Sequence, residues 1–174
     1  ILAQTMMAIG KYEQALEHSN AALAFYQTLP GQDRVKFCSN AKTRQAECYL
    51  ALEQTAKAKQ IIAELMDYAN SSLEPDDPYS ISFMSIRARI LMSEGDLKNA
   101  LKIFKKVHRL ILQRFNSKHP EIVRAKLNIA RAYQKNQKFS NALEYATDAA
   151  NLSIKTWGDK FFLTRQCNQR LASI

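Results

Sequence analysis

The chain has 174 residues, 47% of them hydrophobic, and a formal net charge of +9. Only four glycines and four prolines interrupt it, which argues against a fold of many short strands and favours long helices. No apolar run approaches the roughly 18 residues that span a bilayer, so we expect no membrane-spanning helix.

Alanines recur along the chain at an almost constant spacing. The first series is Ala3, Ala46, Ala88, Ala130 and Ala172, and the second, twelve residues behind it, is Ala15, Ala58, Ala100 and Ala142. A fixed period of about 42 residues is typical of stacked repeats, in which each unit buries its apolar face against the next. Small residues at helix crossings let two helices approach closely. The pattern therefore predicts an all-α fold of paired helices.

About nine helices are expected in chain order, at about 1–9, 11–28, 33–51, 54–71, 78–93, 96–115, 120–135, 138–156 and 162–173. We interpret the chain as a single repeat domain over 1–174, with repeats at about 1–32, 33–77, 78–119 and 120–161. A partial or capping helix occupies 162–174. Because the sequence begins at Ile1 in the middle of the pattern, we expect it to be part of a longer protein.

Two kinds of turn repeat with the helices. Tight turns at Gly10, Glu53, Gly95 and Gln137 separate the two helices of each pair. Between pairs, the segment 73–78 aligns with 115–120, and each ends in a proline. Proline suits the first position of a helix, where the amide has no partner in any case. Asp77, just before such a proline, is a predicted N-cap.

The sequence contains no recognisable catalytic or metal-binding pattern. The three cysteines form no C-x-x-C pair, so we expect buried thiols in a reducing compartment and a cytoplasmic protein. The three histidines share no helical-face spacing, and there is no glycine-rich phosphate loop or nucleophile motif. We therefore expect no enzyme, no cofactor and no metal.

The turns and the residues after them resemble the tetratricopeptide repeat. The matching motifs are G-x-Y-x-x-A-L at 10–16, G-x-L-x-x-A-L at 95–101 and x-x-F-x-x-A-L ending at Leu143. The 42-residue period and the segment 119–122 resemble the kinesin light chain type. This resemblance implies a right-handed α-solenoid of stacked antiparallel helix pairs, a TPR superhelix. Its first helices would line a concave groove that binds peptides or partner helices.

The resemblance places particular residues on that groove. Counting from the first alanine of each repeat gives a mostly polar and basic set. Its predicted contact residues are Asn40, Arg44, Glu47, Arg89, Arg124, Asn128, Arg131 and Arg170, and the same columns also hold Thr43 and Ile86. Arginine offers a bidentate fork to carboxylates, and asparagine both donates and accepts. We therefore expect a protein or peptide partner with an acidic or C-terminal segment.

A second basic feature lies between Gly95 and Lys118, where seven Lys and Arg residues accompany one acid, Asp96. Four of them share one helical face, the basic stripe: Lys98, Lys102, Lys105 and Arg109. Such a convex stripe can bind an anionic surface, nucleic acid or membrane, or serve as a solvated helix face. It lacks interleaved aromatic residues for stacking bases. A regulatory or adaptor region of a larger enzyme or motor is a further alternative, and the oligomeric state stays open.

Overall fold

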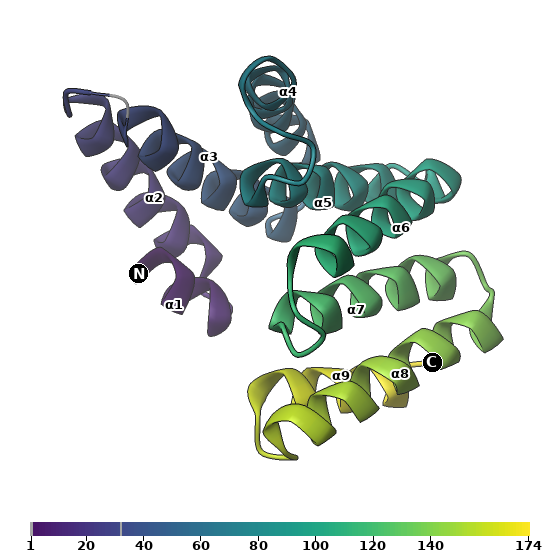
Figure 1. The fold of residues 1–174 in the computed structure, drawn as a ribbon. Helices are drawn as coiled ribbons and strands as arrows, with labels where there is room; N and C mark the ends of the chain where they lie inside the picture. Colours follow the sequence, from purple (N-terminus) through teal and green to yellow (C-terminus); the bar gives the residue numbers. More distant parts are fainter. Residues whose placement is uncertain (1, 32) are drawn as a thin grey trace. The chain divides into compact units, whose positions relative to one another are not determined.

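The computed structural model describes residues 2–31 and 33–174 (Figure 1). Every regular element in these residues is a helix, and there are nine: α1 (Leu2–Ala8), α2 (Tyr12–Gln27), α3 (Asp33–Ala51), α4 (Thr55–Ser72), α5 (Pro78–Ser93), α6 (Leu97–Arg114), α7 (Pro120–Lys135), α8 (Phe139–Trp157) and α9 (Phe162–Ala172). The predicted all-α fold is confirmed, and no predicted end departs from the observed one by more than one residue. Ile1 and Gln32, at the expected start of the first helix and end of the first repeat, lie outside the described residues.

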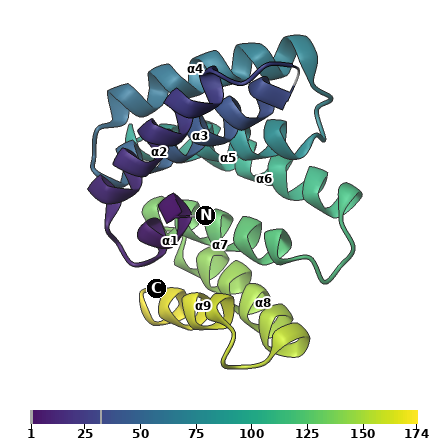
Figure 2. The same cartoon turned by 90° about the vertical axis from the view of Figure 1, so that its left-hand side faces the viewer.

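The helices form two compact units, residues 1–74 with α1–α4 and residues 75–174 with α5–α9. Inside each unit every helix packs against the next along the chain. The first helices of successive pairs also touch, α1 against α3 and α7 against α9. Figure 2 gives a second view of the helices. The expected single domain over 1–174 stays a prediction.

The repeating alanines form the helix crossings. Seven of them are fully buried: Ala15, Ala46, Ala58, Ala88, Ala100, Ala130 and Ala142. In the second unit, Ala88, Ala100 and Ala142 pack with Phe104 and Tyr133 in one apolar cluster. A methyl group at each crossing lets larger neighbours fill the space beside it, so the backbones approach closely.

The turn inside each pair contains a residue in the left-handed region. Its φ is +78° at Gly10, +59° at Glu53, +86° at Gly95 and +57° at Gln137. The next residue donates its N–H to a carbonyl five residues earlier, as Lys138 does to Tyr133 at 3.0 Å. This hydrogen bond ends one helix and reverses the chain into the next. Two of the four turns therefore hold a side chain in a conformation that suits glycine.

Side-chain caps close two of the turns between pairs, those before α5 and α7. The Asp77 carboxylate accepts the N–H of Tyr79 at 2.8 Å, which confirms the predicted N-cap of α5. At the equivalent place before α7, His119 Nδ1 accepts the N–H of Glu121 at 3.3 Å. Each cap satisfies an amide that has no partner within the helix. The two caps therefore fix where α5 and α7 begin.

The last helix is joined firmly to its neighbours. Leu163 and Cys167 of α9 are fully buried and pack with Val123 of α7 and with α8. The Ser153 and Thr164 hydroxyls lie 2.6 Å apart, so both buried groups are satisfied. As a result α9 is a packed part of the second unit and holds its own polar residues at a defined place beside α7.

Candidate functional site

Three arginines of the second unit interact electrostatically. Arg89 lies on α5, Arg131 on α7 and Arg170 on α9. Burial among the surrounding helices is the main cause that lowers the pKa of Arg131, and the charges of Arg170 and then Arg89 lower it further. Like charges lower the pKa of a cation only when they lie close to it. The three guanidinium groups therefore form one cationic cluster, the arginine cluster.

Hydrogen bonds orient one member of this cluster. Arg170 Nη1 donates to Gln134 Oε1 at 2.9 Å and to Ser173 Oγ at 3.4 Å. Gln134 Nε2 in turn donates to the Ser173 carbonyl. Among the described residues, Arg131 has no hydrogen bond or ion pair of its own. The cluster thus combines a fixed guanidinium with one whose donors are available to a ligand.

The other predicted contact residues of α7 differ in their surroundings. Arg124 Nη1 lies 2.6 Å from Glu121 Oε1, and its guanidinium lies 5.9 Å from the centre of the Phe162 ring. Asn128, one turn from Arg124 and nearly one turn before Arg131, is half-buried. Arg124 is therefore already partly neutralised by a neighbour, and Arg131 is the better anion-binding group.

In the first unit, the predicted residues lie on α3. Arg44 Nη1 lies 2.6 Å from Glu47 Oε2, so the two side chains neutralise each other, and Asn40 is exposed. Thr43 and Ile86, which the same columns placed on the groove, are 5% and 2% exposed and cannot contact a partner. A long charged side chain can reach solvent from a half-buried position, but a short or apolar one stays inside.

The basic stripe lies opposite the buried face of α6. Ala100, Phe104, Val107 and Ile111 form the buried face. All four stripe residues are exposed. This strong separation of apolar and charged faces explains why the helix forms and packs here. The stripe itself is a solvated surface. What it can bind depends on the residues of other helices that lie beside it.

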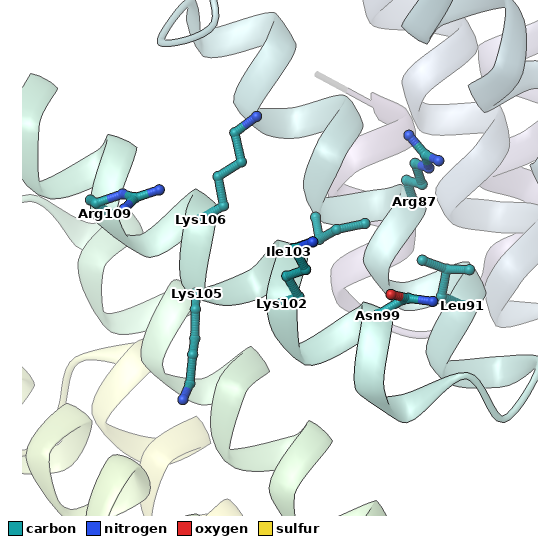
Figure 3. Close-up of a pocket in the computed structure, with 8 residues that line it drawn as sticks. All are labelled: Arg87, Leu91, Asn99, Lys102, Ile103, Lys105, Lys106 and Arg109. Carbon is teal, nitrogen blue, oxygen red and sulfur yellow. The ribbon is translucent and has the colours of Figure 1, made fainter.

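A hollow of about 620 Å³ adjoins the stripe on the second unit, which we call the basic hollow. The residues that line it come from α5 and α6: Arg87, Leu91, Asn99, Lys102, Ile103, Lys105, Lys106 and Arg109 (Figure 3). Lys105 and Lys106 point to opposite sides of α6 in Figure 3. The Lys105 ammonium lies 5.4 Å from the centre of the Tyr133 ring on α7. Four cations are left around the hollow: Arg87, Lys102, Lys106 and Arg109.

The hollow was missed by sequence reasoning, and so were Arg87, Asn99 and Lys106 as site residues. The stripe was defined on one helix, whereas the hollow also needs Arg87 and Leu91 from α5. The only signal in the sequence was Arg87, a basic residue four positions before Leu91 on the helix that precedes the stripe. Spacing alone does not say which face of α5 adjoins which face of α6.

The described part of the chain holds neither a membrane-spanning helix nor a cluster of metal ligands. None of its helices has the length and apolar character needed to cross a membrane. No group of three or more His, Cys, Asp or Glu side chains in residues 2–31 and 33–174 is placed to hold a metal ion.

Comparison with known proteins identifies the repeats. Residues 79–155 match the family model described as tetratricopeptide repeat. These residues are similar in sequence to tetratricopeptide repeats. They run from the start of α5 almost to the end of α8, and the predicted resemblance is thereby confirmed. No curated protein matches the sequence.

Solved structures with tetratricopeptide-like folds extend the likeness to nearly the whole chain. One is the "putative kinesin light chain nearly identical TPR-like repeats" of Podosopora anserina, 20% identical, with a TM-score of 0.69 over 99% of this chain and 81% of that one. A single-residue variant of that protein matches equally. Another is BtubC (BKLC) from P. vanneervenii, 16% identical, with a TM-score of 0.70 over 93% of this chain and 65% of that one. At these identities the likeness shows the fold, a solenoid of helix pairs.

Proposed function

We propose that this chain is a protein-interaction scaffold that binds an acidic or C-terminal peptide segment at the arginine cluster of the second unit. Tetratricopeptide repeats in general act as scaffolds for protein–protein interaction, and that coarser role fits the matched residues 79–155. The partner's acidic character is the new element. It rests on Arg131 and its two neighbours.

The repulsion that Arg131 experiences from two neighbouring guanidinium groups is the observation that carries this proposal. The charges of Arg170 and Arg89 disfavour the charged form of Arg131. A carboxylate bound at Arg131 replaces repulsion with attraction, and the Arg131 fork can hold it by two parallel hydrogen bonds. An acidic ligand therefore gains more here than at an isolated surface arginine.

Neighbouring polar groups give the site direction. Asn128 lies on the same helix as Arg131, three residues earlier, and its amide can both donate to and accept from a peptide backbone. Gln134 holds Arg170 in place, so less side-chain entropy is lost when a ligand binds. An extended peptide would then be held by its backbone at Asn128 and by a carboxylate at the arginine cluster.

The test is a titration with fluorescent hexaglutamate, with a free or an amidated carboxyl terminus. Arg131→Glu should weaken binding by at least about tenfold, since it removes one charge-assisted contact and adds a repulsive one. Arg165→Glu is the matched control, because Arg165 is exposed on α9 and makes the same change in net charge. Lys102→Gln/Lys106→Gln, which changes the basic hollow, should weaken this binding far less than Arg131→Glu does.

Three results discriminate the possibilities. Equal loss in Arg131→Glu and Arg165→Glu would mean that net charge, and not the arginine cluster, attracts the peptide. Undiminished binding by folded Arg131→Glu would refute the assignment. A preference for the free over the amidated peptide would identify the terminal carboxylate as the group bound.

A further inference from the structure

We propose that the basic hollow between α5 and α6 binds a small ligand that carries two or more phosphate groups on a hydroxylated ring, the chemistry of a phosphorylated inositol. This site is separate from the arginine cluster. It uses Arg87 of α5 together with Lys102, Lys106 and Arg109 of α6.

Some cations elsewhere in the protein are paired with acids. Lys126 Nζ lies 3.2 Å from Asp148, and Arg114 Nη1 lies 3.2 Å from Asp76. In contrast, none of the four cations of the basic hollow makes a hydrogen bond or ion pair with any described residue, and no acid lines the hollow. Four like charges around one concavity raise the local concentration of anions and repel one another until an anion binds.

Charge balance indicates how much negative charge the hollow accommodates. A phosphate monoester carries about −1.5 to −2 at neutral pH, so two such groups balance four cations. Arg87 and Arg109 offer planar forks that fit phosphate oxygens, and Lys102 and Lys106 add point charges. A single carboxylate would leave most of this charge unbalanced. A ligand with clustered phosphates is therefore the best match.

The rest of the lining indicates the scaffold that bears the phosphates. Leu91 and Ile103 supply an apolar surface against which the uncharged face of a ring can lie. Asn99 Nδ2 donates to Asp96 Oδ2 at 2.7 Å, which leaves the side-chain carbonyl of Asn99 available to accept from a ligand hydroxyl. The volume of about 620 Å³ suits a small molecule.

The lining also argues against nucleic acid. No Phe, Tyr or Trp is among the residues that line the hollow, so a nucleobase would have nothing on which to stack. A nucleic-acid backbone would instead engage the whole basic stripe, including Lys98, which does not line the hollow. Substitution of Lys98 therefore distinguishes binding of nucleic acid along the basic stripe from binding of a small ligand in the basic hollow.

The experiment measures binding of two probes by the whole chain. Inositol trisphosphate is titrated calorimetrically, and phosphatidylcholine vesicles containing phosphatidylinositol bisphosphate are used in a sedimentation assay. We expect saturable binding with one ligand per chain. Lys102→Gln/Lys106→Gln should weaken it by about a hundredfold, because each substitution removes one charge-assisted hydrogen bond worth about tenfold in affinity. Both residues are exposed on a helix, where glutamine is as good a helix former as lysine, so the variant keeps its fold.

The matched control is Lys98→Gln/Lys118→Gln, which removes the same charge from the same basic segment outside the hollow. It should bind nearly as well as the unaltered protein. Binding of the soluble probe identifies a free phosphate ligand, and binding of vesicles alone, with the same loss in Lys102→Gln/Lys106→Gln, identifies the lipid headgroup. The proposal is overturned if neither probe binds, if the two double variants lose affinity equally, or if duplex DNA binds more tightly than both probes.

Discussion

Replacing Gln137 by glycine should stabilise the second unit. Gln137 has a φ of +57° in the turn between α7 and α8, and its side chain is exposed. A residue with a Cβ costs about 1–2 kcal/mol in the left-handed region, whereas glycine loses roughly 0.5–1 kcal/mol of backbone entropy on folding. The difference is a gain of about 0.5–1 kcal/mol. In a unit of this size, that raises the melting temperature by roughly 2–8 °C.

The assay is thermal unfolding followed by far-UV circular dichroism, with two controls on the same unit. Lys135→Gly, at the last residue of α7, should not raise the melting temperature, because glycine is a poor helix former. Gly95→Gln should lower the melting temperature, and the cost is conformational because no atom lies within 4 Å of a Cβ built there. If Gln137→Gly melts no higher than the unaltered protein, the left-handed turn is not the source of strain.

Three further predictions concern the core and the buried titratable groups. Ala142→Leu should overpack a fully buried crossing and cost about 1–3 kcal/mol in a urea titration, whereas no loss would show that the crossing has room. Burial lowers the pKa of half-buried His108, so the unfolded chain binds its proton more readily. Stability should therefore fall as the pH drops below about 6.5, and a His108→Gln variant should not share that fall. Burial raises the pKa of Cys48 and of Cys167 to about 11, so under native conditions a thiol reagent should modify Cys38 first, and mass spectrometry of peptides checks the order.

Much of the fold could be predicted because every helix pair has the same physical requirement, close packing at the helix crossing. A helix crossing needs a small residue, so alanines such as Ala88 and Ala130 fix the register of every helix around them. The alanine pattern does not predict the backbone conformation of the turns. Glu53 and Gln137 occupy the positions of Gly10 and Gly95, and their left-handed backbone follows from the geometry of the turn rather than from their own preferences.

The candidate sites were less predictable, because they depend on side chains that meet from different helices. Columns counted from the alanines brought Arg89 and Arg131 to equivalent places, and their charges do interact. The same columns treated Ile86 as a surface residue, although an apolar side chain at a half-buried position stays in the core. The ion pair between Arg44 and Glu47 depends on the rotamers of both side chains. Counting positions from the alanines does not predict those rotamers.

The charged face of α6 affects how fast a partner arrives, not only how tightly it is held. Lys98, Lys102 and Arg109 extend into solvent opposite the core, so their field reaches beyond the surface by about 8–10 Å at ordinary ionic strength. An anionic partner that diffuses past is drawn toward α6 before any contact forms. Association should therefore slow steeply as salt is added, while dissociation, which depends on short-range contacts, changes much less.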